Sequence, residues 1–412
     1  MKKTIIAALA AMSLLLSACS NKADNSSENA SSETKQTESI GADNSSTYDD
    51  EYGDNYITVE DYFHLKNDLG SKLQDYKEKG YTVDEQAGYV YTNADGFVDD
   101  HNRTYGSEGI VLIERLTDEK VLTIPEAING QKVVACLNDV FLDFDQENNR
   151  HYVPCEKIYF PKDMQEAIVT FPRAKDLVEV VLPQNQSVIV AGMFHQCEKL
   201  SSIELPDSVE VIGEYAFRGC ESLNGSLALP KSLITISFQA FEGCKSITEI
   251  QFNDKLEEIG SMAFTSCRLL TKVTLPKKVK HIGSLCFERC TSLCEITLPE
   301  SLTEIGKCAF SQTKITRIVI PSKITVIEPK TFNECSELSE VVLNDGLQRI
   351  EVNAFKSCTS LKEIYIPATV EYISEDAFNK CEDITIKGKS GSYAEKYAEE
   401  QGFEFVASNS SN

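Results

Sequence analysis

The 412-residue sequence lacks the short motifs that mark the common classes of enzyme. It contains no G-x-S-x-G, H-E-x-x-H, G-x-x-x-x-G-K-[ST] or G-x-G-x-x-G segment, so nothing indicates a serine hydrolase, a zinc protease or a nucleotide-binding enzyme. The few histidines occur in unrelated settings, at positions 64, 101, 151, 195 and 281. Carboxylates are abundant, but a pair of them needs a cleft that excludes water. We therefore expect no catalytic residue and no cofactor.

Basic residues are also scarce. Lys and Arg number 40 against 64 Asp and Glu, which gives a formal net charge of −24. Nucleic acid and anionic lipid surfaces repel a chain with this balance. We exclude nucleic acid as a partner.

The sequence opens on an apolar run, Ile5 to Leu16, that is too short for an ordinary membrane span. Lys2 and Lys3 precede it, and this layout is typical of a secretory signal over residues 1–18. Residues 16–19, Leu-Ser-Ala-Cys, resemble a bacterial lipobox, in which Cys19 carries the lipid and becomes the new N-terminus. A plain signal peptide with a chance cysteine is the alternative. A lipid on Cys19 would anchor the chain to a membrane with the rest facing outward.

Residues 19–56 follow with almost no apolar side chain. The segment consists mainly of Ser, Asn, Asp, Glu and Thr, so it cannot offset the entropy lost on ordering. We expect a disordered tether that serves as a spacer.

The main feature of the sequence is a repeat marked by phenylalanine. After a first step of 30 residues, the phenylalanines recur every 22–24 residues, and a fixed period in this range indicates a solenoid. They lie at positions 141, 171, 194, 217, 241, 264, 287, 310, 332, 355 and 378. A single coil cannot close a core by itself, so each one must bury its apolar edge against the next.

Each repeat predicts one short strand. In one of them Ile203-Glu204-Leu205 alternates with a period of two, and Pro206 ends the strand because it cannot donate to the ladder. Asn253 and Asn344 take the place of the proline in two coils, where asparagine also favours a turn. Stacking these strands predicts a parallel sheet along an elongated rod.

The full phrase is L-x-x-I-x-L-P followed by V-x-x-I-G-x-x-A-F-x-x-C. It resembles the leucine-rich repeat of the BspA-like bacterial surface proteins from about Ile124 to Val406. The resemblance implies a leucine-rich-repeat solenoid, which we place at residues 121–386. It also implies adhesion to host matrix proteins, host cells or other bacteria. The extra polar sequence near residues 143–151 is expected in a surface loop.

Segments on both sides of the array are expected to cap it, because an open end would expose unpaired edges and bare core. In residues 57–120 we predict a helix from Thr58 to Lys79, a hairpin in which residues 89–91 and 97–98 pair, and a strand from Ile110 to Ile113. The acidic turn in this hairpin could suggest calcium, but Tyr91 and Asn102 occupy positions where a calcium loop needs acidic residues. Residues 387–412 are expected to form a short helix, a strand and a polar tail.

Eight of the fourteen cysteines occupy the third place after the repeat phenylalanine, and Ala174 and Thr313 fill that place in two other coils. These eight are Cys197, Cys220, Cys244, Cys267, Cys290, Cys335, Cys358 and Cys381. The substitutions indicate a packing position, so we predict mostly buried free thiols, although spacing alone leaves bridges between stacked coils open. Cys286, Cys290 and Cys294 could suggest a metal site, but they lie at different places around one coil, and we expect no metal.

Two functions fit these features. The first is a lipid-anchored recognition or adhesion protein of the bacterial cell surface, acting as a monomer, whose array binds a host or bacterial protein or glycan. The second is a non-catalytic envelope lipoprotein with a structural or substrate-capturing role. Exposure of the array on intact cells would separate the two.

One candidate binding site follows from the outward positions of the predicted sheet. Down the stack these positions are Val181, Glu204, Ala228, Gln251, Thr274, Thr297, Val319, Val342, Tyr365 and Thr385. Val319, Val342 and Tyr365 should form one exposed apolar strip, flanked by the charges of Arg317, Glu340 and Glu363. An apolar centre with an aromatic residue and a charged rim is typical of binding surfaces. The alternative is that β-branched residues merely suit an exposed strand.

Overall fold

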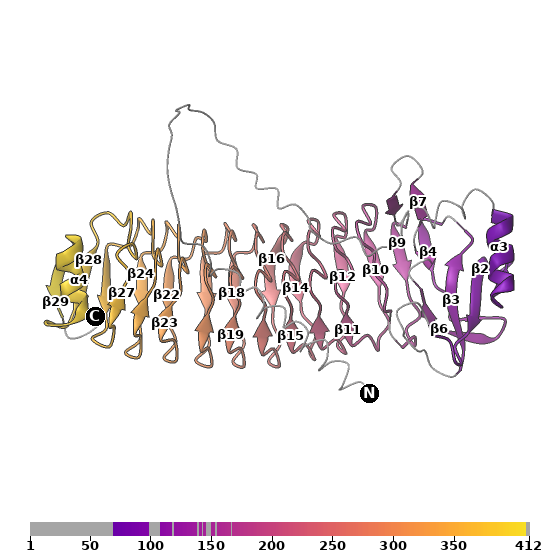
Figure 1. The fold of residues 1–412 in the computed structure, drawn as a ribbon, viewed down its shortest axis with the longest axis horizontal. Coiled ribbons are helices and arrows are strands. Elements are labelled where there is room, and N and C mark those ends of the chain that lie inside the picture. The colour runs from indigo at the N-terminus through magenta and orange to yellow at the C-terminus, as the bar shows by residue number, and fades with distance from the viewer. Residues whose placement is uncertain are drawn as a thin grey trace, which may run out of the picture.

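The computed structural model describes residues 69–98, 108–117, 119–137, 140–141, 143–145, 150–152, 155–165 and 167–408. The predicted signal peptide, Cys19 and the tether lie outside these residues. The chain winds into a long rod of stacked coils, with the C-terminal helix at one end and the N-terminal sheet at the other (Figure 1). The predicted solenoid is therefore confirmed.

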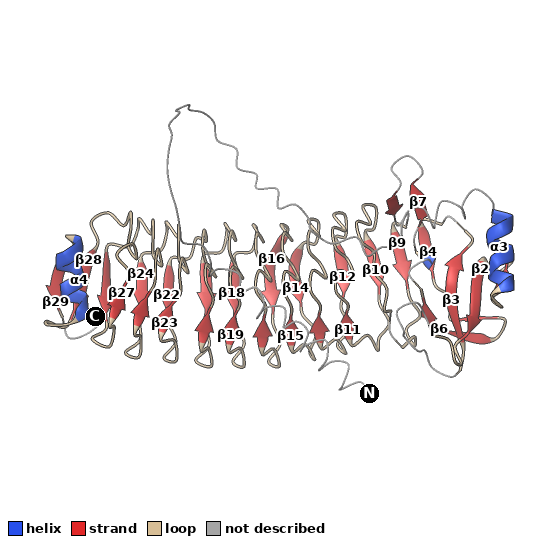
Figure 2. Cartoon of the chain, in the orientation of Figure 1, coloured by secondary structure: helices blue, strands red, loops and turns tan. Residues whose placement is uncertain are grey.

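The first strand of each coil belongs to a parallel stack along the rod (Figure 2). In order, its members are β4 (Val121–Thr123), β9 (Lys157–Tyr159), β10 (Glu179–Val181), β12 (Ser202–Glu204), β14 (Gly225–Ala228), β16 (Ile247–Gln251), β18 (Lys272–Thr274), β20 (Glu295–Thr297), β22 (Arg317–Val319), β24 (Glu340–Val342), β26 (Glu363–Ile366), β28 (Thr385–Gly388) and β29 (Glu404–Ala407). The predicted strand at residues 203–205 is β12, which ends one residue earlier than expected. We call this set the first stack.

A second strand in the coils was not predicted. Its members, the second stack, are β11 (Val188–Ile189), β13 (Val211–Ile212), β15 (Thr235–Ile236), β17 (Glu258–Ile259), β19 (His281–Ile282), β21 (Glu304–Ile305), β23 (Val326–Ile327), β25 (Arg349–Ile350) and β27 (Tyr372–Ile373). These strands also pair in parallel. A strand of two residues is too short to show an alternating pattern. Gly283 follows β19 because a Cβ there would lie 2.3 Å from the backbone nitrogen of Ser261 in the preceding coil.

The repeat phenylalanines form one buried column inside the rod. All eleven are fully buried. From Phe171 to Phe378 successive rings stack with centroids 5.0–5.8 Å apart and planes within 22° of parallel. The column confirms that each coil buries its apolar edge against its neighbours.

Asparagine replaces the strand-ending proline by bonding to the coil before it. The side-chain amide of Asn253 donates to the carbonyls of Pro230 and Leu233 at 2.6 and 3.0 Å. Its carbonyl oxygen accepts from the backbone N–H of Lys255 at 2.6 Å. Asn344 makes the same kind of contacts. The predicted turn is confirmed at both positions.

The N-terminal end is a mixed five-stranded sheet beside helix α3 (Leu69–Glu78). Its order is β1 (Thr82–Asp84), β2 (Tyr89–Asn93), β3 (Ile110–Arg115), β6 (Gln131–Cys136) and β5 (Ala127–Ile128). The predicted hairpin is wrong in its pairing, because β2 pairs with β1 and β3 and not with residues 97–98. Backbone bonds from Ala94 to Gly109 and from Phe97 to Ala94 turn the chain away from β2 at that point. The extra sequence near residue 143 forms a hairpin of β7 (Asp143–Asp145) and β8 (Arg150–Tyr152).

The C-terminal end has the expected helix and strand. Helix α4 (Tyr393–Gln401) ends at Gly402, whose φ of 75° is left-handed, and β29 pairs in parallel with β28. Tyr397 is buried, and its ring lies 6.2 Å from that of Phe378, the last of the column. The helix thus covers the end of the phenylalanine column.

The described helices, α3 and α4, have 10 and 9 residues. A membrane-spanning helix needs about 20 apolar residues. Within the described part of the chain, no helix therefore meets the requirement for crossing a bilayer.

Candidate functional site

The predicted strip lies on the outward face of the first stack, near the C-terminal end of the rod. Val319 in β22 is directly opposite Val342 in β24, and Tyr365 lies in β26, the next strand of the stack. Val319 is 41% exposed, while Val342 and Tyr365 are half-buried. The strip thus runs along the rod across three consecutive coils.

None of the three side chains belongs to the core. The residue just before each of them in its strand points inward and is buried. These residues are Ile318 in β22, Val341 in β24 and Ile364 in β26. The partly buried apolar side chains that pack against the core do not include Val342 or Tyr365. Packing inside the rod therefore does not require apolar residues at these positions.

The charges beside the strip are paired with each other. Arg317 Nε lies 2.8 Å from a carboxylate oxygen of Glu340, across β22 and β24. Glu363 is paired with Lys387 Nζ at 2.7 Å. The sequence analysis named Arg317, Glu340 and Glu363 but missed Lys387. Each acid is matched by a base, so the rim is polar but has little net charge. Exposed pairs of this kind contribute little to stability.

One position of the outward row was wrong. Thr385 was expected to follow Tyr365, but it is opposite Glu363, and Lys387 is opposite Tyr365. The reason is that Ile386, not Ile384, pairs with Ile364 in this last coil. In the outward row the strip is therefore followed by Lys387 and not by a threonine.

Upstream of the strip the outward face is mostly polar. Ala228 is the one small apolar residue among exposed Glu204, Gln251, Thr274 and Thr297. Val181, opposite Tyr159 in β9, and Val406, opposite Lys387 in β28, are exposed nearer the two ends of the stack. Isolated apolar residues are common on protein surfaces, whereas three consecutive ones are the exception on this face.

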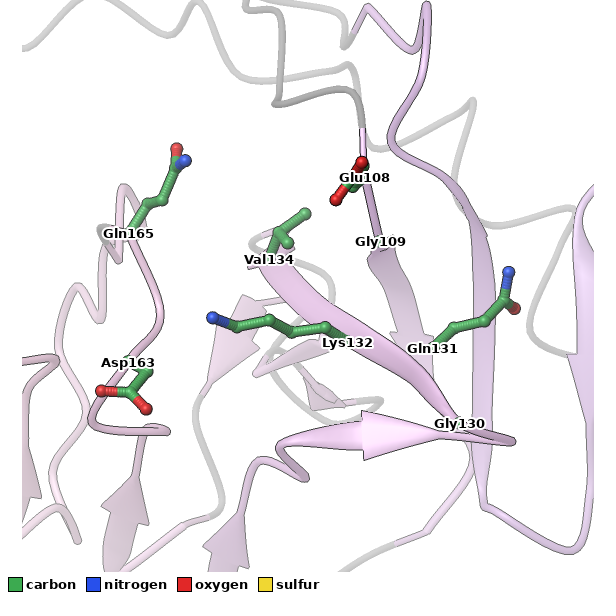
Figure 3. Close-up of a pocket in the computed structure, with 8 residues that line it drawn as sticks. All are labelled: Glu108, Gly109, Gly130, Gln131, Lys132, Val134, Asp163 and Gln165. Carbon is green, nitrogen blue, oxygen red and sulfur yellow. The ribbon is translucent and has the colours of Figure 1, made fainter.

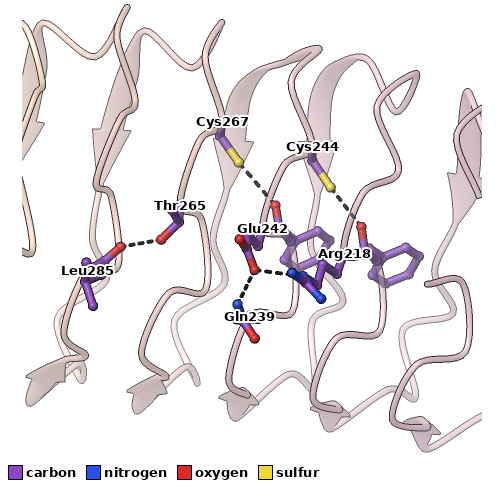
Figure 4. A network of polar contacts seen from close by, with 9 residues as sticks. Arg218, Gln239, Glu242, Cys244, Thr265, Cys267 and Leu285 are labelled. Atoms are coloured by element: carbon purple, nitrogen blue, oxygen red, sulfur yellow. Dashed lines mark hydrogen bonds and ion pairs between the residues drawn. The ribbon is translucent and has the colours of Figure 1, made fainter. Parts of the chain in front are cut away.

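The eight ladder cysteines are buried as predicted, and they also form hydrogen bonds that were not predicted. Each ladder thiol points at the backbone carbonyl of the phenylalanine one coil earlier, at 3.0–3.4 Å, as Cys244 and Cys267 show in Figure 4. All thirteen cysteines of the described region are free thiols. Burial raises the pKa of the Cys290 thiol to about 12. These thiols are structural and poorly nucleophilic.

The three cysteines weighed as metal ligands do not share an environment. Cys286 and Cys290 are buried, whereas Cys294 is exposed and its thiol lies 3.5 Å from the carbonyl of Thr271. No group of three metal-ligating side chains occurs among the described residues.

A pocket of about 620 Å³ lies at the N-terminal end of the rod, between the β5–β6 hairpin and the turn at residues 161–165 (Figure 3). Lys132 extends from β6 toward the turn that carries Asp163. The lining residues are Glu108, Gly109, Gly130, Gln131, Lys132, Val134, Asp163 and Gln165. They include no nucleophile paired with a base, which a hydrolytic or transfer reaction would need.

The repeats match a known family model. The model describes a BspA type leucine rich repeat region and matches six copies within residues 168–273 and 258–385. Together these ranges cover more than half of the chain. No curated protein sequence matches.

Several solved structures are similar at low identity. A leucine-rich repeat protein from Bacteroides ovatus is 21% identical, covers 80% of this chain and 99% of its own, and has a TM-score of 0.49. A leucine rich cell surface protein from Faecalibacterium prausnitzii is 19% identical over 80% and 95% of the two chains, with a TM-score of 0.31. The pneumococcal vaccine antigen PcpA is 18% identical over 77% and 100%, with a TM-score of 0.41.

Proposed function

Because this chain belongs to the BspA-type leucine-rich repeat family, we propose that it is a non-catalytic recognition protein of the bacterial cell surface. Its array would present a binding surface to a protein on a host or on another bacterium. The observation that carries this proposal is the strip of Val319, Val342 and Tyr365, which lies outside the core on three consecutive coils.

The composition of the strip favours a protein over a glycan as partner. Two of its three side chains are valines, which offer no hydrogen-bonding group. The neighbouring charges of Arg317, Glu340 and Glu363 are already engaged in ion pairs. An apolar centre with one tyrosine and a polar rim is typical of the central part of protein–protein interfaces. A partner with an apolar patch of its own would bury the strip.

The predicted N-terminal anchor and tether would fit this role. A lipid on Cys19 would hold the protein at a membrane, and the tether at residues 19–56 would keep the rod away from the surface. The array would act as a monomer, since each coil already has neighbours of the same chain on both sides.

Two experiments test the proposal: capture of a partner by the immobilised protein, and exposure of the array to protease on intact cells. Immobilised protein should retain a purified matrix or surface protein from a panel that also contains glycans. Protease added to intact cells should remove the array. Capture of a glycan alone would overturn the assignment of a protein partner, and an array protected on intact cells would favour the role inside the envelope.

A further inference from the structure

A second group of apolar side chains lies along the rod on four consecutive coils. It consists of Tyr215, Phe238, Met262 and Leu285, which we call the ridge. All four are half-buried, and none is among the partly buried residues that pack against the core. The rings of Tyr215 and Phe238 meet edge to face with centroids 5.3 Å apart. The ridge residues lie in the turns that follow β13, β15, β17 and β19 of the second stack, whereas the strip lies on strands of the first stack.

The backbone of the ridge makes its composition unexpected. Tyr215, Met262 and Leu285 have φ values of 57°, 57° and 58°, in the left-handed region. Glycine and asparagine adopt this conformation most readily, and Gly192 and Asn353 occupy the same place in other coils, with φ values of 63° and 55°. Gln239, Cys308 and Lys330 hold it in three further coils with φ values of 51°, 56° and 58°, so the coil sets this backbone whatever the side chain. Bulky residues there cost conformational energy, and the core does not use them. Since polar Gln239 and Lys330 adopt the same backbone, the coil does not require an apolar side chain at this place.

Carboxylates border the ridge. Glu214 precedes Tyr215, and the N–H of Glu288 donates to the carbonyl of Leu285 at 3.1 Å, which places it in the same turn. Burial raises the pKa of both carboxyl groups. Neither forms an ion pair with any residue that the structure describes.

A nearby acid shows the contrasting case. Glu242 is held by Arg218 at 2.9 Å and also accepts a hydrogen bond from Gln239 (Figure 4). An ionised carboxylate that is half-buried without a cation pays a desolvation cost, which a partner's cation would offset. Glu214 and Glu288 therefore lack the ion-pairing cation that Arg218 provides for Glu242.

We propose that the ridge is a second docking surface, which binds a protein segment that places apolar side chains next to Lys or Arg. The apolar side chains would cover Tyr215, Phe238, Met262 and Leu285. The cations would pair with Glu214 and Glu288. This complementarity selects against acidic partners, whose charges would meet the same carboxylates.

The probe for this surface is a fluorescein-labelled peptide of four Leu-Lys units, followed by fluorescence polarisation with the purified protein. Peptides of four Leu-Glu and four Ser-Lys units test the two requirements separately. We expect the Leu-Lys peptide to bind at least ten-fold more tightly than either. The Ser-Lys comparison is essential, because a chain with a net charge of −24 attracts any cationic peptide.

The test variant is Tyr215→Asn with Leu285→Asn, which removes two apolar side chains and installs the residue found at Asn353. Because asparagine suits the left-handed backbone, its melting temperature should equal or exceed that of the wild type. Its affinity for the Leu-Lys peptide should fall at least ten-fold. Val319→Ser with Val342→Ser, on the first stack, should bind this peptide like the wild type.

Three results would overturn the proposal. One is equal binding of the Leu-Lys and Ser-Lys peptides, or no binding of either. Another is a lower melting temperature of the double asparagine variant, which would make Tyr215 and Leu285 structural. The third is a dimer of the wild type in sedimentation equilibrium that the same variant disperses, because a second copy would then be the occupant. Failure of the strip variants to lose capture leaves these results unaffected.

Discussion

The thiol of Cys267 lies 3.4 Å from the backbone carbonyl oxygen of Phe241, one coil earlier, and can donate a hydrogen bond to it. The same relationship recurs at the other seven ladder cysteines. This hydrogen bond accounts for the preference for cysteine at the third place after the repeat phenylalanine. Packing alone would not produce that preference, whereas the thiol is a small apolar group that also carries a donor. Thr313, which interrupts the ladder, turns its hydroxyl to the carbonyl of its own coil's Phe310 at 2.9 Å.

Burial of the ladder predicts which thiols react. At neutral pH, Ellman's reagent should modify Cys294 first, because it is exposed, and Cys308 more slowly, because it is half-buried. The ladder thiols should react only after denaturation, because all eight are buried, and burial raises the pKa of thiols such as Cys220 and Cys267 well above 9. Cys294→Ser should remove the fast phase. Rapid modification of many thiols in the folded protein would contradict the described burial.

The phenylalanine column predicts a large effect of truncating one ring. Phe264→Ala should destabilise the array by about 3–5 kcal/mol, because it removes a fully buried ring between two stacked neighbours. Phe238→Ala is the matched control, because its half-buried ring lies outside the core. Urea denaturation followed by circular dichroism measures both. Equal midpoints for the two variants would show that Phe264 does not act as a core residue.

The half-buried acids predict a pH dependence. Burial raises the pKa of Glu214 and Glu288, so the folded state binds their protons more tightly than the unfolded state does. Their ionisation therefore lowers stability as the pH rises through the raised pKa values. Glu214→Gln with Glu288→Gln should raise the melting temperature at pH 8, and the gain should vanish in acid, where the wild-type groups are protonated. A gain that persists unchanged at pH 3 would have another cause.

The proposed anchor is tested by its cysteine. Cys19→Ala removes the thiol that would carry the lipid, so the protein should be found soluble or with its N-terminal segment uncleaved. Cys294→Ala, which leaves residues 16–19 intact, should fractionate with membranes like the wild type. Membrane fractionation of a processed Cys19→Ala protein would show that Cys19 is not the anchor.

An element could be predicted from the sequence when its residue pattern was long enough to be distinctive. The phenylalanine period spans the array, and it indicates the solenoid because only stacking satisfies so many equal apolar edges. The second strand could not be predicted, since two residues such as Val211 and Ile212 carry no alternation. The register of the last coil was also missed, because Ile384 and Ile386 fit the pattern equally well and only the pairing with Ile364 separates them.

The candidate sites show the same limit. The strip could be found because outward positions follow from the period of two along each strand. Its ion pairs could be expected only in part, because Lys387 lies in the coil whose register was wrong. The ridge left no signal, since a left-handed backbone is not expected at Tyr215, Met262 or Leu285. Only the structure shows that these residues lie in the turns of consecutive coils, half-buried and outside the core.

The most direct test of the recognition role is the affinity of the strip variants for the protein that the wild type captures. Surface plasmon resonance should detect no binding by Val342→Ser with Tyr365→Ala, while its melting temperature stays that of the wild type. Thr274→Ala with Thr297→Ala changes the same outward row on two earlier coils and should bind normally. Equal affinity of the strip variant and the wild type would contradict the account.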